Sequence, residues 1–273
     1  MALAYFQCDD LPDDIRNIPL EYGQKAVRWL KRHPSVSGQR VGVFGRSKGA
    51  ELALVLGSSF SDISFVIASS PSSAVAIGTS TVSAESKQFV PQSSWSYRCV
   101  PLPFVPWTEA QCREAEKRLE NLQRIDDIHA ASLQNKAATA KATTPVENIR
   151  GPILLIGSGD DHWWPSDLHC RRIKERLAGH NFAHECLHLS YEKSGHGIRF
   201  PYIPTTRTRL NGGTPAGHCK IVSLHNKPSA RFHAEGDDRL LSSHLSRMKR
   251  YMQLRFDACS RFCLAASMLR SKT

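Results

Sequence analysis

The stretch RVGVFGRSKGAELALVL, residues 40–56, sets a serine between two apolar runs. Residues 40–44 predict a short buried strand, and residues 50–56 predict an apolar helix. Gly45 and Gly49 flank Ser47 in the pattern G-x-S-x-G. A strand entering this turn and a helix leaving it indicate a nucleophile elbow, whose strained backbone exposes the serine hydroxyl above the sheet. The alternative interpretation is a glycine-rich turn without chemistry.

A serine hydroxyl needs two partners to become a good nucleophile: a histidine that takes its proton and a carboxylate that orients the histidine. In this kind of sheet the partners follow the serine along the chain, each at the carboxyl end of a strand. Asp160 and Asp161 follow an apolar run, and His196 follows the next one in a Ser-Gly-His-Gly turn. We therefore predict a triad of Ser47, one of these aspartates and His196, with the Lys48 amide N–H facing the oxyanion.

The remaining apolar runs predict strands that alternate with helices. The expected helices cover residues 20–30 and 166–177, and the further strands cover residues 63–68, 153–156 and 183–189. This alternation indicates an α/β fold, with a mostly parallel sheet and helices on both of its faces. Residues 71–144 are rich in Ser, Thr and Pro, with a polar helical stretch around residues 109–125. We expect them to form a variable excursion or lid.

The net charge of +11 is concentrated at one end of the chain. Residues 207–273 contain 13 Lys and Arg against 4 Asp and Glu, so they carry +9 and residues 1–206 carry only +2. If the protein binds an acidic partner, residues 207–273 are therefore the segment expected to bind it. Because the tail has neither an aromatic-rich RNA-binding signature nor paired Cys/His spacing, a nucleic-acid-binding module is kept only as an alternative function.

Cysteine usage and hydropathy predict an intracellular protein without a membrane span. The eight cysteines are scattered and form no C-x-x-C pair, which is typical of free thiols in a reducing compartment. There is no run of 18 apolar residues, and the strand-like start over residues 2–6 is too short for a signal peptide. The chain ends in Ser271-Lys272-Thr273 and not in the peroxisomal signal Ser-Lys-Leu, so we expect a cytoplasmic location.

One motif indicates a different chemistry. His184-Glu185-Cys186-Leu187-His188 matches H-E-x-x-H, the pattern of zinc peptidases. Such a zinc site requires a helix, on which residues four apart share one face. This segment is predicted to be a strand, along which four residues span about 13 Å, too far for one metal ion. We therefore predict no metal site and no cofactor.

Several motifs in order resemble the catalytic domain of acyl-CoA thioesterases and bile acid-CoA:amino acid N-acyltransferases. They are Leu3-Ala4-Tyr5 with Asp10-Leu11-Pro12, Ser47-Lys48-Gly49-Ala50-Glu51-Leu52-Ala53-Leu54, Thr144-Pro145-Val146-Glu147 with Gly151-Pro152-Ile153-Leu154, Asp160-Asp161-His162-Trp163-Trp164-Pro165-Ser166, and Gly195-His196 with Pro201-Tyr202. The resemblance covers residues 1–206 and implies an α/β-hydrolase fold. By motif it implies a triad of Ser47, Asp161 and His196, with Asp160 as the alternative acid. Amino-acid-conjugating members carry cysteine at the nucleophile, so a serine favours thioester hydrolysis.

The chain departs from the family pattern at both ends. It resembles the family without its N-terminal β-sandwich, and it begins within what resembles the fourth strand of the hydrolase sheet. The preceding strand and loop normally supply a second oxyanion N–H, and losing one such donor costs about 10²–10³ in turnover. After residues 211–215 a terminal amphipathic helix is expected, but the sequence turns basic. We therefore predict a partial catalytic domain over residues 1–206, missing its first strands, and a basic tail over residues 207–273.

The predicted function is hydrolysis of acyl-CoA thioesters or related esters through a seryl acyl-enzyme. Two alternatives stand beside it and the nucleic-acid-binding tail. One is a catalytically impaired remnant without a complete oxyanion hole, and the other is a serine peptidase of the same fold. Residues near the triad receive structural roles: Trp163 and Trp164 are expected to pack over the Asp161 turn, and Arg46 and Lys48 to be solvated charges.

Overall fold

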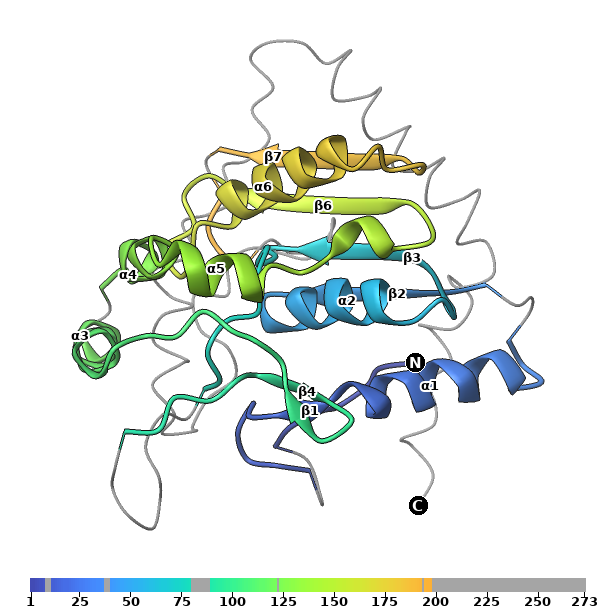
Figure 1. Ribbon diagram of the computed structural model, residues 1–273, viewed down its shortest axis with the longest axis horizontal. Coiled ribbons are helices and arrows are strands. Elements are labelled where there is room, and N and C mark those ends of the chain that lie inside the picture. The colour runs from blue at the N-terminus through green and yellow to red at the C-terminus, as the bar shows by residue number, and fades with distance from the viewer. Residues whose placement is uncertain (8–10, 37–39, 80–88, 122, 193, 198–273) are drawn as a thin grey trace, which may run out of the picture.

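The computed structural model describes residues 1–7, 11–36, 40–79, 89–121, 123–192 and 194–197 (Figure 1). Its centre is a four-stranded sheet in the order β2-β3-β6-β7, in which every neighbouring pair is parallel. The strands are β2 (Val41–Arg46), β3 (Ile63–Ser69), β6 (Ile153–Ser158) and β7 (Cys186–Tyr191). This arrangement confirms the α/β fold with a mostly parallel sheet flanked by helices.

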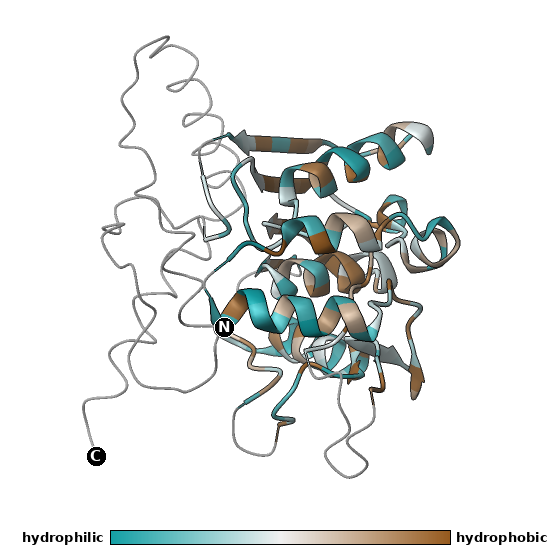
Figure 2. Ribbon diagram, turned by 90° about the vertical axis from the view of Figure 1, so that its left-hand side faces the viewer, coloured by the Kyte–Doolittle hydropathy of each residue, from teal (hydrophilic) through white to brown (hydrophobic). Residues whose placement is uncertain are grey.

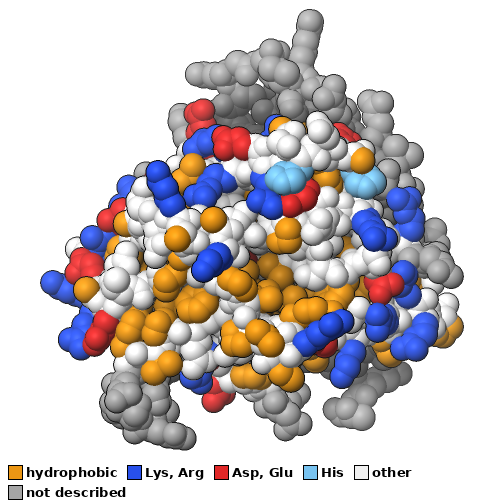
Figure 3. All heavy atoms as spheres, in the orientation of Figure 1, with side chains coloured by type: hydrophobic (Ala, Val, Ile, Leu, Met, Phe, Trp, Pro, Cys, Tyr) orange, Lys and Arg blue, Asp and Glu red, His pale blue; other side chains and the backbone are white. Residues whose placement is uncertain are grey.

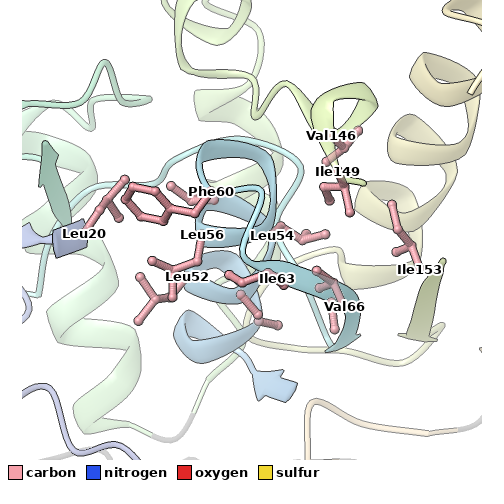
Figure 4. Close-up of a cluster of buried hydrophobic side chains, with 14 of the residues drawn as sticks. Leu20, Leu52, Leu54, Leu56, Phe60, Ile63, Val66, Val146, Ile149 and Ile153 are labelled. Carbon is pink, nitrogen blue, oxygen red and sulfur yellow. The ribbon is translucent and has the colours of Figure 1, made fainter. Parts of the chain in front are cut away.

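One face of the sheet is covered by amphipathic and apolar helices, which stand in front of it in Figure 1. They are α1 (Leu20–Arg32), α2 (Lys48–Ser59) and α6 (Ser166–Gly179). Their buried side chains and those of the strands form the main core, and Figure 4 shows Leu54 and Leu56 of α2 at its middle. Gly23 lets α1 approach α2 closely, because a Cβ there would lie 2.8 Å from Leu56 Cδ1. This packing holds the C-terminal half of α2 against α1.

The other face of the sheet carries a smaller apolar cluster that is built from strand residues. Ile67, Leu154 and Leu189 are buried there, with Phe65 and Tyr191 packed against them. Among the described residues no helix contributes to this cluster, so the expectation of helices on both faces of the sheet is not met in the described part of the chain. The helices in Figure 2 carry both hydrophilic and hydrophobic residues along their length.

The segment predicted as an excursion contains its own elements. β4 (Trp95–Tyr97) pairs with β1 (Ile18–Pro19) and with β5 (Val100–Pro101) in a small sheet. The helices are α3 (Glu109–Glu120), α4 (Asp126–Ser132) and α5 (Lys136–Ala142), followed by the 3₁₀ helix η1 (Val146–Asn148). The polar helix expected over residues 109–125 therefore ends earlier, at Glu120. Its start is set by a capping box between Thr108 and Gln111.

The strand-like run at the start of the chain is not a strand in the structure, so that expectation is wrong. Residues 1–5 have no regular secondary structure. An apolar run makes a strand only when a neighbouring strand accepts its backbone hydrogen bonds. Here Tyr5 instead packs edge-on against Trp95, with ring centroids 5.7 Å apart.

Charges on the described surface are mixed. On the face seen in Figure 3, Lys and Arg side chains lie interspersed with Asp and Glu. Arg28 and Lys31 of α1, for example, both pair with Asp62, at 3.3 and 3.2 Å. No helix within the described residues is long and apolar enough to cross a membrane. The predicted basic tail, residues 207–273, lies outside the described residues.

Candidate active site

Ser47 occupies a strained turn between a strand and a helix. It follows β2 directly and precedes Lys48, the first residue of α2, with φ 55° and ψ −125°. A non-glycine residue in such a conformation costs about 1–3 kcal/mol and persists only where its surroundings enforce it. The Ser47 N–H donates to the Ser69 carbonyl at the end of β3, at 2.9 Å. The turn is therefore anchored to the neighbouring strand, and its backbone has the form expected of a nucleophile elbow.

Gly45 is required by the tightness of this turn. A Cβ at position 45 would lie 1.9 Å from the Gly49 carbonyl oxygen and 2.6 Å from the Ala50 amide nitrogen. Both atoms belong to the backbone, so neither can rotate away. At Gly49, in contrast, a Cβ would meet only the Tyr5 hydroxyl oxygen at 3.6 Å, which is an ordinary contact. The space in the turn therefore requires glycine at position 45 but not at position 49.

We expect Gly45→Ala to lower the free energy of unfolding by about 2–4 kcal/mol, because the backbone of α2 must move away from β2. Gly49→Ala is the matched control, and its effect should stay within about 1 kcal/mol since alanine suits a helix. Urea unfolding followed by circular dichroism measures both. Equal destabilisation by the two substitutions would contradict this account of the turn.

Three side chains predicted from the sequence meet above the carboxyl ends of the strands. His196 Nε2 lies 2.8 Å from Ser47 Oγ. His196 Nδ1 lies 2.9 and 3.0 Å from the two carboxylate oxygens of Asp161. Ser47 follows β2, Asp161 follows β6 and His196 follows β7, so a parallel sheet brings together residues up to 149 positions apart. The contacts allow a proton to pass from the hydroxyl to the imidazole while the carboxylate holds the ring.

The Asp161 carboxylate is buried and well supplied with donors. It is 3% exposed, and its Oδ1 accepts hydrogen bonds from the backbone N–H groups of Trp163 and Trp164 at 2.9 and 3.2 Å. Burial alone would raise the pKa of Asp161, but the nearby His196 and the hydrogen bonds outweigh it and hold the pKa below its usual value. Asp160 points elsewhere, since its Oδ1 lies 2.9 Å from His162 Nε2. Of the two aspartates, only Asp161 contacts His196.

The loop that carries His196 is held by a second set of contacts. The Ser70 hydroxyl donates to the His196 carbonyl at 2.9 Å, and Trp164 Nε1 donates to the Ser70 carbonyl at 3.0 Å. Ser70 has a positive φ of 47°, directly after β3. Trp164 is buried and meets the His196 ring edge-on, with centroids 5.5 Å apart. Ser70 lies in no sequence motif that could have indicated this role.

The expectation that Lys48 is a solvated charge is wrong. Its side chain lies largely buried, with Nζ 3.3 Å from Oε1 of Glu51. Glu51 is fully buried in α2, where every neighbour from Ala50 to Gly57 is also buried. Burial lowers the pKa of Lys48 and raises that of Glu51, although the attraction between them opposes both changes. A glutamate within an otherwise apolar helix, three residues after a lysine, was the sequence signal for this pair.

The zinc-peptidase pattern lies only partly on a strand, because the strand predicted over residues 183–189 is β7 at Cys186–Tyr191. Cys186 begins β7, so His188 belongs to the strand and His184 precedes it. Within the described part of the chain no three His, Cys, Asp or Glu residues are grouped so that they could hold a metal ion. The segment contributes to the sheet, where Leu187 packs in the smaller apolar cluster.

Comparison with known proteins finds a matching family and relatives whose names agree with it. A family described as "BAAT / Acyl-CoA thioester hydrolase C terminal" matches residues 18–217. The chain is 32% identical over 251 residues to acyl-coenzyme A thioesterase 5 of Mus musculus. The matched region covers 88% of this chain and 55% of the relative. It is 28% identical over 211 residues to the peroxisomal succinyl-coenzyme A thioesterase of the same organism, covering 77% of this chain and 45% of the relative. The chain thus spans about half the length of these curated relatives.

Solved structures offer more distant likenesses. The acyl-protein thioesterase 2 of Zea mays matches 72% of this chain and 66% of its own, at 18% identity and a TM-score of 0.33. A puromycin-hydrolyzing peptidase of Mycobacterium tuberculosis matches 66% of this chain and 22% of its own, at 12% identity and a TM-score of 0.38.

Proposed function

This chain belongs to the BAAT / acyl-CoA thioester hydrolase C-terminal family, and we propose that it hydrolyses acyl-CoA thioesters with Ser47 as the nucleophile. The observation that carries the proposal is the pair of contacts made by His196, to Ser47 Oγ at 2.8 Å and to the Asp161 carboxylate at 2.9 Å. A buried carboxylate, an imidazole and a strained serine in this order form the apparatus of acyl transfer. The relatives named as thioesterases support an acyl-CoA substrate.

The reaction begins when His196 Nε2 removes the proton of Ser47 Oγ, which attacks the thioester carbonyl carbon. Asp161 stabilises the resulting imidazolium through Nδ1. The tetrahedral intermediate then expels the CoA sulfur, which takes the proton from His196, and the acyl group remains on Ser47 as an ester. Next, His196 removes a proton from water, the hydroxide attacks the ester, and Ser47 recovers its proton as the carboxylic acid leaves.

The negative charge of each tetrahedral intermediate develops beside the start of α2. Lys48 is the first residue of that helix, so its N–H has no acceptor within the helix. The same end of the helix carries the positive end of the helix dipole. We assign the Lys48 amide as an oxyanion donor on this basis, because preorganised N–H groups stabilise such charge in acyl transfer.

Serine as the nucleophile favours hydrolysis over transfer to an amine. A seryl ester is attacked readily by water, whereas the thioester formed by a cysteine nucleophile is more easily intercepted by amines. An intracellular site of action agrees with the described cysteines Cys99, Cys112, Cys170 and Cys186, which are all free thiols. One relative is named as peroxisomal and another as mitochondrial, so a cytoplasmic location stays a prediction.

The test is release of CoA thiol from acyl-CoA thioesters of increasing chain length, followed with a thiol reagent. We expect the rate of CoA release to rise in proportion to protein concentration. Matched p-nitrophenyl esters, followed by the absorbance of p-nitrophenolate, should be cleaved more slowly, and peptide amides should not be cleaved. Preferential cleavage of peptides would contradict the proposal in favour of a peptidase. Folded protein that cleaves neither thioester nor ester would indicate the catalytically impaired remnant.

A further inference from the structure

We infer that the buried side chain of Lys48 is a positioning group for the reaction at Ser47, because it ties the start of α2 to two distant segments and so fixes the amide beside the nucleophile. The inference rests on the proposed function. It extends that function from the residues that touch substrate to a buried group that acts through the backbone.

The Lys48 ammonium has an acceptor for each of its three hydrogens. Nζ donates to Ser94 Oγ at 2.6 Å, to the Ile77 carbonyl at 3.0 Å and to Glu51 Oε1 at 3.3 Å. Ile77 and Ser94 lie 29 and 46 residues further along the chain, on the two sides of the stretch 80–88. Lys48 therefore ties both segments to the nucleophile turn.

The acceptors are themselves held in place. The Ser94 hydroxyl donates to the Ala76 carbonyl at 2.8 Å, which leaves its oxygen lone pairs to accept from the ammonium. Glu51 Oε1 also accepts from Trp95 Nε1 at 2.7 Å. Trp95 is fully buried in β4. The network thus connects buried groups and not exposed ones.

A gain in stability does not by itself explain the buried ion pair of Lys48 and Glu51. Burying two charges costs desolvation that their attraction repays only partly, and apolar side chains of similar volume often stabilise a core as well or better. The position of Lys48 suggests what the pair contributes instead. Its N–H belongs to the same peptide group as the Ser47 carbonyl, so anchoring its side chain restricts how the turn can rotate. Oxyanion donors must be placed within about 0.5 Å to be effective.

The first experiment compares two buried serines of the same strand region. Ser94→Ala removes an acceptor of the Lys48 ammonium, whereas Ser96→Ala removes a hydroxyl that donates to the Asn17 carbonyl at 2.7 Å and does not contact Lys48. We expect Ser94→Ala to lower kcat by about tenfold with KM unchanged, since only the transition state uses the oxyanion donor. The Ki of an acyl trifluoromethyl ketone, which forms a hemiketal oxyanion on Ser47, should rise by the same factor. Ser96→Ala should leave kcat and Ki within about twofold.

A second variant removes the charges without leaving one of them unpaired. Lys48→Met alone would strand Glu51 as a buried charge and can fail to fold, so it is combined with Glu51→Gln, which keeps an oxygen for Trp95 Nε1. This double variant should retain a cooperative thermal transition and show the kcat and Ki defects of Ser94→Ala or larger ones.

The outcomes separate the two claims. If the wild-type chain shows no Ser47-dependent cleavage, the proposed function fails and this inference fails with it. If the wild type is active while Ser94→Ala and the folded double variant match Ser96→Ala in kcat and Ki, the positioning role is overturned and the proposed function stands. A rise in KM with kcat unchanged would also overturn it, since that result indicates substrate binding.

Discussion

Ser47→Ala is expected to lower kcat for acyl-CoA hydrolysis by about 10⁵–10⁶-fold. Without the hydroxyl no acyl-enzyme can form, and only the slow attack of water on a bound substrate remains. Release of CoA thiol measures the loss, and burst kinetics with a p-nitrophenyl ester should show no initial burst. KM should change little, because the hydroxyl contributes chiefly to the transition state.

The matched control for this substitution is Ser58→Ala at the other end of the same helix. The Ser58 hydroxyl donates to the Val55 carbonyl at 2.9 Å and belongs to the last turn of α2. We expect its turnover to stay within about twofold of the wild type. Comparable losses in the two variants would show that α2 tolerates no change, and retained turnover in Ser47→Ala would exclude Ser47 as the nucleophile.

Asp161→Asn should lower kcat by about 10⁴-fold. Asp161 accepts a hydrogen bond from His196 Nδ1 and thereby leaves Nε2 free to take the serine proton. An asparagine amide can donate to Nδ1 instead, which places the ring proton on Nε2 and removes the base. Because the pKa of Asp161 is held below its usual value, the carboxyl stays ionised and the defect should be constant over about pH 6–9.

Asp160→Asn is the matched control, one position earlier in the same turn. Its carboxylate contacts His162 and not His196, so the expected change in kcat is within about threefold. Steady-state kinetics of the two variants over the pH range decide between the aspartates. A larger loss in Asp160→Asn would contradict the observed geometry as the active arrangement.

The elbow and the alternation of elements could be predicted because their signals are local. The strand expected over residues 40–44 is β2 at Val41–Arg46, and the helix expected over residues 50–56 is α2 at Lys48–Ser59. Side-chain periodicity and the glycines at 45 and 49 act within one or two turns of backbone, so the sequence alone contains them. The run over residues 2–6 is the exception: its local pattern is that of a strand, but strand formation also needs a neighbouring strand, and none among the described residues pairs with it.

The sequence by itself determined that a serine would stand at a strand-to-helix turn, with acidic and histidine side chains after later strands. The family resemblance favoured Asp161 with Asp160 as the alternative, and the tertiary structure decided which of them touches His196, since both follow the same strand and their side chains point in different directions. The tertiary structure also decided that Lys48 is buried. Its partners, Ile77 and Ser94, come from distant parts of the chain, and no periodic pattern encodes contacts that arise only when separate segments pack together.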